Sequence, residues 1–160
     1  MKRISLIIVV LFFFTVHSNS QTDWQVLNSG VIVNLYGVYF TNINTGYVCG
    51  ASGTILKTTN AGSNWNLINS SVSYQLNDIC FANDITGYCS GNSGIIKTTN
   101  AGVNWFSVFS GNQMNKIQCI GNVIYSGGQN GIYKSTDSGF IKALIRGKTG
   151  LILFPVIQEQ

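Results

Sequence analysis

The chain has 160 residues, with 9 Lys or Arg against 5 Asp or Glu, and its formal charge at pH 7 is +4. Because the lysines are scattered, the sequence lacks the basic stripe that a nucleic-acid surface needs. The length suits a single domain, and regularly spaced glycines with one proline, Pro155, favour short strands and tight turns.

The N-terminal segment 1–20 has the pattern of a secretory signal peptide. Lys2 and Arg3 form the charged start, residues 6–16 form an apolar stretch, and small residues precede Gln21, where we expect cleavage. The apolar stretch is too short for a membrane span, which needs about 20 residues. The sequence therefore predicts an exported protein, secreted, periplasmic or at the cell surface, without a membrane span after cleavage.

Three tryptophans mark an internal repeat. Trp24, Trp65 and Trp105 lie 41 and then 40 residues apart, and the string KTTNAG-x-NW recurs in the units 35–65 and 76–105. A shorter third unit covers residues 114–140. A period of about 40 residues fits one four-stranded propeller blade. We therefore predict an all-β fold, with about three β-propeller blades in residues 21–140.

Each unit predicts the same succession of strands. The expected first strands are 35–40, 76–81 and 116–120, the second are 46–50, 87–91 and 123–127, and the third are 54–58, 95–98 and 132–135. A fourth strand begins at Trp65 and at Trp105, and residues 24–27 are expected to form one as well. In the strand 35–40 both faces are apolar, so we expect that strand to be buried between neighbouring sheets.

The segments between the third and fourth strands resemble Asp-boxes, also called BNR repeats. Their motif residues are Asn60, Gly62 and Trp65, then Asn100, Gly102 and Trp105, then Asp137 and Gly139. The polar side chain can hydrogen-bond to the backbone of its own turn, and glycine permits a left-handed backbone conformation. Tryptophan buries apolar surface. We interpret these residues as structural. We expect no metal, since Asn replaces the carboxylate in two of the turns.

The whole unit, including Gly-Tyr before a Gly-x-x-Gly turn, resembles the photosystem II assembly and stability factor family over residues 24–140. This family is widespread in secreted bacterial proteins without a link to photosynthesis. The resemblance implies a β-propeller and, as one possible function, an assembly factor that docks on a membrane protein complex. Photosynthetic members use an arginine-rich patch, whereas the arginines of this chain, Arg3 and Arg146, lie outside the repeats.

The third unit departs from the pattern after Phe140. Lys142 stands where a tryptophan is expected, and residues 141–160 carry no repeat signature. We interpret this segment as an atypical closing segment or as a truncated or frameshifted end. Because a closed ring usually needs four to eight blades, about three blades predict an incomplete propeller, or two copies that close one ring as a dimer.

Catalytic alternatives find little support in the sequence. Sialidases also carry Asp-boxes, but they hold the substrate carboxylate with an arginine triad that scattered lysines cannot replace. The nearest carboxylates, Asp78 and Asp84, have no match in the third unit, and Asp84 is interpreted as a turn residue. The single histidine, His17, lies in the predicted signal peptide, so no Ser-His-Asp or Cys-His arrangement remains.

The sequence thus predicts a non-catalytic binding or scaffold module without a cofactor. We expect a protein or glycan partner, but the residues do not define which. Tyr36, Tyr47 and Tyr88 are candidates for a sugar or peptide surface, or for packing between blades.

The cysteines are Cys49, Cys80, Cys89 and Cys119. An even number in an exported chain permits disulfides. Cys80 and Cys89 flank the first hairpin loop of one blade and can face each other across it. The alternative is that the cysteines are small buried residues. A zinc site is not predicted, because histidine and paired Cys-x-x-Cys motifs are missing.

Overall fold

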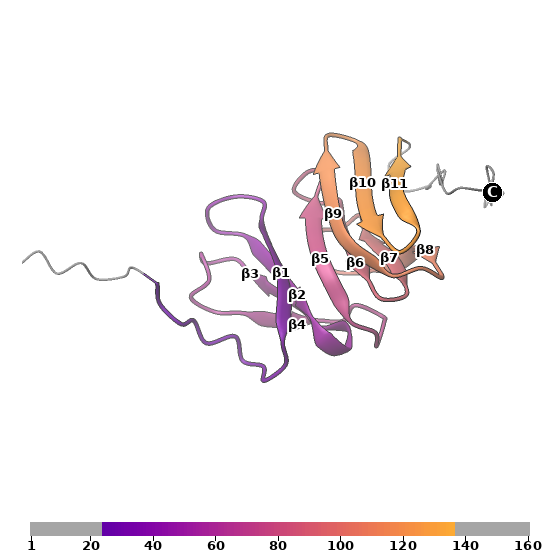
Figure 1. Cartoon of the computed structure of the whole chain (residues 1–160). Coiled ribbons are helices and arrows are strands. Elements are labelled where there is room, and N and C mark those ends of the chain that lie inside the picture. The colour runs from indigo at the N-terminus through magenta and orange to yellow at the C-terminus, as the bar shows by residue number, and fades with distance from the viewer. Residues whose placement is uncertain (1–23, 137–160) are drawn as a thin grey trace, which may run out of the picture.

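A computed structural model of the chain describes residues 24–136. The predicted signal peptide, the third turn with Asp137 and Gly139, and the segment 141–160 lie outside the described residues. The described strands form three antiparallel sheets, each built from consecutive strands (Figure 1). The first sheet holds β1 (Leu35–Phe40), β2 (Gly46–Gly50), β3 (Ile55–Thr58) and β4 (Asn66–Ile68). The second holds β5 (Leu76–Phe81), β6 (Gly87–Gly91), β7 (Gly94–Thr98) and β8 (Phe106–Ser110), and the third holds β9 (Met114–Ile120), β10 (Val123–Gly128) and β11 (Gly131–Ser135).

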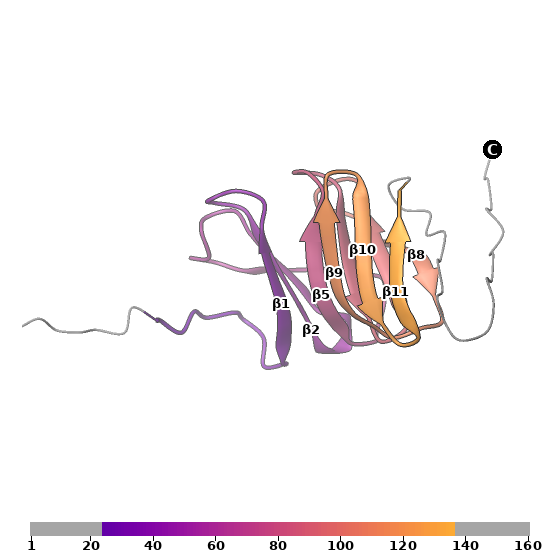
Figure 2. The ribbon, with the colours of Figure 1, turned by 45° about the horizontal axis from the view of Figure 1, so that its top comes forward.

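The three sheets pack face to face in the order in which they occur along the chain (Figure 2). Their first strands lie side by side, since β1 contacts β5 and β5 contacts β9. Meandering antiparallel sheets stacked in this way are the blades of a β-propeller. The sheets are named the first, second and third blade below.

The repeat period predicted most strand bounds to within one or two residues. β1, β2, β5 and β6 have the expected bounds, whereas β9 begins earlier, at Met114. All three inner strands also have a register shift near their start, which leaves one residue unpaired: Tyr36 in β1, Asn77 in β5 and Asn115 in β9. Such a β-bulge redirects a side chain, and no sequence pattern considered above predicts it.

Two apolar clusters fill the spaces between the blades. The first, between the first and second blades, contains Tyr47, Cys49, Ile55, Leu76, Ile79, Phe81, Cys89, Ile96 and Trp105. The second, between the second and third blades, contains Cys80, Tyr88, Ile95, Met114, Ile117, Ile124 and Tyr133. Because successive residues of a strand point to opposite faces, the second blade supplies side chains to both clusters.

Two expectations from the sequence are wrong. Residues 24–27 form no strand, because the third strand that would pair with them in a preceding blade is not among the described residues. In addition, β1 is not buried on both faces. Val38 and Phe40 are exposed on the face turned away from the second blade, since no described sheet covers that face.

Candidate functional site

The turns 58–65 and 98–105 have the same internal hydrogen bonds. The backbone N–H of Asn64 donates to Asn60 Oδ1 over 2.9 Å, and that of Asn104 donates to Asn100 Oδ1 over 2.9 Å. The glycines take the left-handed backbone, with φ of 84° at Gly62 and 83° at Gly102. Both asparagine side chains are therefore engaged within their own turns.

A threonine two residues before each asparagine completes these turns. Thr58 Oγ1 donates to Asn60 Oδ1 over 2.9 Å and accepts the N–H of Gly62 over 3.0 Å. Thr98 makes the equivalent bonds with Asn100 and Gly102 over 3.0 and 2.9 Å. The motif residues alone did not predict this role of the threonines, but the string Lys-Thr-Thr-Asn, which occurs in both units, carries a signal for it.

The turn 98–105 also joins the second blade to the first. The carbonyl oxygen of Ala101 accepts hydrogen bonds from Tyr47 Oη and Lys57 Nζ, each over 2.9 Å. Burial, with a smaller contribution from the charge of Asp84, raises the pKa of Tyr47, so its hydroxyl keeps the proton that it donates. Tyr47 and Tyr88 are both buried, and only Tyr36 of the three candidate tyrosines is exposed.

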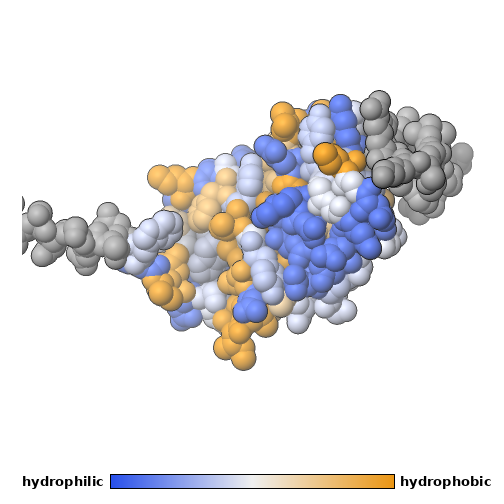
Figure 3. Space-filling model, viewed as in Figure 1, coloured by the Kyte–Doolittle hydropathy of each residue, from blue (hydrophilic) through white to orange (hydrophobic). Residues whose placement is uncertain are grey.

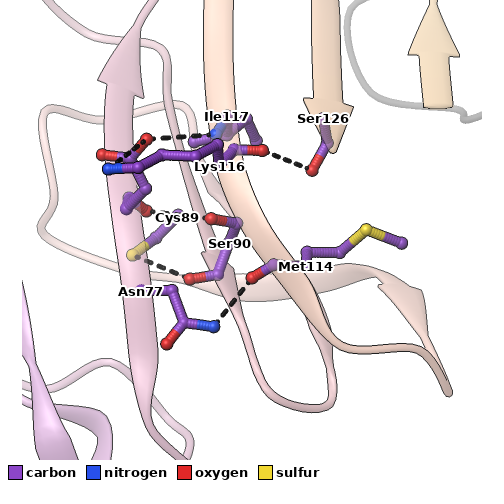
Figure 4. Close-up of polar contacts among 8 residues, drawn as sticks. Asn77, Cys89, Ser90, Met114, Lys116, Ile117 and Ser126 are labelled. Atoms are coloured by element: carbon purple, nitrogen blue, oxygen red, sulfur yellow. Dashed lines mark hydrogen bonds and ion pairs between the residues drawn. The ribbon is translucent and has the colours of Figure 1, made fainter. Parts of the chain in front are cut away.

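A polar network joins the second blade to the third (Figure 4). The carboxylate of Asp78 accepts the backbone N–H of Ile117 over 3.2 Å and lies 3.7 Å from Lys116 Nζ. Asn77 Nδ2 donates to the carbonyl oxygen of Met114 over 2.8 Å. Asp78 is thus part of this junction, whereas Asp84 acts on Tyr47 at the other junction. The two carboxylates serve different contacts.

The cysteines differ from the expected hairpin pair. Cys80 forms a disulfide with Cys119, between the inner strands of the second and third blades. Cys80 cannot meet Cys89 across the hairpin, because the register places Ile79 opposite Cys89 and the two cysteines point to opposite faces. Cys49 and Cys89 are free and buried. Burial and a hydrogen bond with Cys49 raise the pKa of the Cys89 thiol.

A row of side-chain amides lies where the inner strands of the second and third blades begin. Gln75 Nε2 donates to Asn77 Oδ1 over 2.7 Å, and Asn77 Nδ2 donates to Asn92 Oδ1 over 2.9 Å. In the third blade, Gln113 Nε2 donates to Asn115 Oδ1 over 2.9 Å. Both amide hydrogens of Asn77 are engaged, with Asn92 and with the carbonyl oxygen of Met114, whereas the other four amides keep further donors or acceptors. These five residues, named the amide row, can therefore match the N–H and C=O groups of an extended peptide.

In one view of the molecule, the surface over the first blade differs in chemistry from the surface over the third. Apolar residues gather over the first blade, and hydrophilic residues dominate over the third (Figure 3). The third blade carries an open hollow of about 400 Å³, lined in part by Lys116, Gln118, Tyr125 and Ile132. A second hollow of about 450 Å³ lies beside Trp65 and is lined mainly by Asn and Ser residues.

Within residues 24–136, no cluster of three or more His, Cys, Asp or Glu side chains is present that could hold a metal ion. The same range contains no helix with the length and apolar character of a membrane span. The described residues form blades of a β-propeller, with exposed outer sheet faces on the first and third blades.

Comparison with known proteins gives the family. The model of the photosynthesis system II assembly factor YCF48 family matches residues 16–150, and the chain belongs to this family. No curated protein matches the chain.

Solved structures share the fold at low sequence identity. A structure of YCF48 bound to D1 peptide has a TM-score of 0.62 and 22% identity, over 70% of this chain and 41% of that one. YCF48 from Cyanidioschyzon merolae has a TM-score of 0.62 and 22% identity, over 72% of this chain and 38% of that one. An ancestral GH74 enzyme matches with a TM-score of 0.59 and 20% identity, over 71% of this chain and 19% of that one. The chain spans about two fifths of the YCF48 proteins that it matches.

Proposed function

We propose that this protein is a non-catalytic binding module that recognises an extended segment of a protein partner, as an assembly factor does when it docks on a membrane protein complex. The observation that carries the proposal is the family match over residues 16–150. A YCF48 structure with a bound D1 peptide supports a peptide as the ligand class.

The amide row is the proposed contact surface. Asn92, Gln113 and Asn115 are exposed, and their amides can both donate to and accept from a peptide backbone. Arginine is missing from residues 24–136. Recognition by neutral amides is screened little by salt, unlike recognition by an arginine patch. We therefore expect peptide binding to change by less than about twofold between low and physiological salt.

Peptide titration tests this function. The D1 peptide and several unrelated unstructured peptides are titrated, with fluorescence anisotropy as the readout. Asn92→Ala together with Gln113→Ala is expected to weaken binding at least about tenfold, because several hydrogen bonds are lost. Asn122→Ala, an exposed amide in the turn between β9 and β10, is the matched control. Absence of saturable binding to every peptide, or equal loss in the control, contradicts the proposal.

We infer also that the chain does not catalyse a reaction and that it is exported. Asp78 is engaged by the backbone of the neighbouring blade, which leaves it poorly placed as an acid or base. The signal-like segment 1–20 supports export. Mass spectrometry of the chain from an export-competent host is expected to find Gln21 at the N-terminus.

A glycan is the second ligand class that we propose. The half-buried ring of Trp65 lies in a hollow with Asn28, Asn60 and Asn64, a combination of aromatic and amide groups that suits a sugar. Quenching of tryptophan fluorescence by oligosaccharides, lost in Trp65→Ala, tests it.

A further copy of the chain is the third proposed partner, because the three described blades leave an outer sheet face at each end.

A further inference from the structure

The face of the first blade that is turned away from the second blade is named its leading face. Side chains on this face are exposed, whereas the side chains at the same positions of the second blade are buried. Val38 of β1 is 63% exposed, whereas Ile79, at the same position of β5, is 2% exposed. Phe40 is 43% exposed, whereas its counterpart Phe81 is 3% exposed. The first blade therefore carries the residues of a blade junction without the neighbouring blade.

The contacts of the second blade show what such a face binds. Phe81 stacks on Tyr47 of the first blade with ring centroids 4.2 Å apart, and its carbonyl oxygen accepts a bond from Tyr39 Oη over 3.1 Å. In the same junction, Tyr47 and Lys57 donate to Ala101 in the turn of the second blade. A leading face is thus covered by a tyrosine and a lysine of the preceding blade, which lie opposite each other in its sheet.

The face of the third blade turned away from the second, named its trailing face, repeats this pair. Tyr125 lies opposite Lys134, as Tyr47 lies opposite Lys57, and Lys134 Nζ is 5.5 Å from the centre of the Tyr125 ring. Ile132 is 72% exposed, whereas the equivalent Ile55 is fully buried. The third blade therefore presents the other half of a junction.

Within residues 24–136, the sheet of the third blade has an edge that no fourth strand covers. Its sheet has the order β11-β10-β9, so among the described residues β11 lacks the fourth strand that β4 and β8 provide in the other blades. An exposed strand edge can pair with a strand from another chain.

The N-terminal segment lies against the first blade, at the place where the fourth strand of a preceding blade would lie. Leu27 Cδ1 is 3.2 Å from the position that a Cβ would take on Gly62. Ile68, in the fourth strand β4, has its Cδ1 3.4 Å from the equivalent position on Gly102. Leu27 thus occupies, against the first blade, the place that Ile68 occupies against the second.

We propose that a second copy of this chain binds head to tail, so that residues 25–27 of one copy add as the fourth strand to β11 of the other. The register of β3 with β4 pairs Ile55 with Ile68 and Lys57 with Asn66. Transferred to β11, it pairs Ile132 with Leu27 and Lys134 with Gln25. The leading face of one copy then covers the trailing face of the other. The described blades of two copies number six, within the usual range for a closed ring.

These contact surfaces rest on the self-association proposed above. The mass of the protein in solution tests whether the dimer forms. Light scattering after size exclusion is expected to give twice the mass of one chain. Ile132→Lys places an unpaired charge in the contact. We expect it to raise the chain concentration at which half of the dimer has dissociated at least about tenfold. Val103→Lys is the matched control, because Val103 is 69% exposed and lies on neither face. A monomeric parent chain, or equal effects of both variants, overturns the proposal.

Disulfide trapping tests the register and polarity. Chains with Leu27→Cys are mixed with chains carrying Ile132→Cys under mild oxidation, and a cross-linked pair of chains is expected. Mixing Leu27→Cys with Val103→Cys is the control. Equal cross-linking in both mixtures overturns the strand addition. Peptide binding by the Ile132→Lys chain is measured in parallel, so that failure of peptide recognition and failure of self-association are seen separately.

Discussion

The two blade junctions have the same architecture but are held by different chemistry. At the first, Tyr39 donates a hydrogen bond to Phe81 and aromatic rings stack. At the second, the residues in the same two strand positions are Cys80 and Cys119, which form the disulfide. Asp78 adds a charged acceptor there. The fold thus fixes which positions meet between blades, and the side chains decide whether the contact is apolar, polar or covalent.

Removal of the buried tryptophan should be the most damaging change at the first junction. Trp105 is buried and packs edge-on against Phe81 with ring centroids 6.3 Å apart, whereas Trp65 is half-buried. We expect Trp105→Ala to lower the free energy of unfolding by about 3–5 kcal/mol and Trp65→Ala by under about 2 kcal/mol. Denaturant unfolding measures both.

Trp105→Phe distinguishes packing from hydrogen bonding. Trp105 Nε1 has no hydrogen-bond partner in the part of the chain that the structure describes. Phenylalanine should therefore retain more than half of the stability that alanine loses. Equal losses for Trp105→Ala and Trp65→Ala would contradict the difference between the two turns.

Loss of the disulfide should be the largest effect at the second junction. Cys80 and Cys119 are 39 residues apart, and a cross-link over such a loop stabilises by about 2–4 kcal/mol. We expect Cys80→Ser with Cys119→Ser to lose this amount in denaturant unfolding. Reducing agent should destabilise the parent chain equally and leave the variant unchanged. A response of the variant to reductant would show that another disulfide is present.

Polar substitutions at the second junction should separate its two charged residues. Asp78→Ala leaves the N–H of Ile117 without its acceptor, so we expect a loss of about 1–3 kcal/mol. Lys116 has a side chain that is 74% exposed, and Lys116→Ala should cost under about 1 kcal/mol. Thermal unfolding of both variants checks the order. The reverse order would mean that the ion pair, rather than the backbone bond, dominates.

The last expected effect is a dependence of stability on pH that comes from the Cys89 thiol at the first junction. The pKa of Cys89 is raised in the folded chain, whereas an unfolded thiol ionises near pH 8.5. Above that pH the unfolded state binds fewer protons, so stability should fall, by up to about 1.4 kcal/mol for each pH unit. Unfolding at pH 7 and pH 9.5 measures the loss, and Cys89→Ala should show a smaller one.

The sequence predicted the strands better than the contacts between them. Strand bounds follow from local alternation and from glycines, and β1, β2, β5 and β6 end where the repeat predicts. The pairing of Cys80 with Cys119 depends on which face of each strand meets the next blade, and it escaped the sequence analysis. One residue in each inner strand is unpaired, so the residues after it point to the face opposite to the one that strict alternation predicts. Asn77 is the unpaired residue of β5, and its side chain reaches the third blade.

The site was predicted only in part. The sequence singled out Asn60 and Asn100, whose side chains accept hydrogen bonds within their own turns, but it did not single out Thr58 and Thr98, which bond to the same turns. The amide row was missed as well, because Asn and Gln are common throughout the chain and only the fold brings these five together.

The disulfide also determines how the molecule yields to force. It fastens the second blade to the third, whereas the first blade is held to the second by hydrogen bonds and packing. A pull applied between the first and third blades therefore opens the junction at Tyr47 and Ala101 first. The second and third blades stay joined by the disulfide, so we expect the first blade to separate from them as one unit.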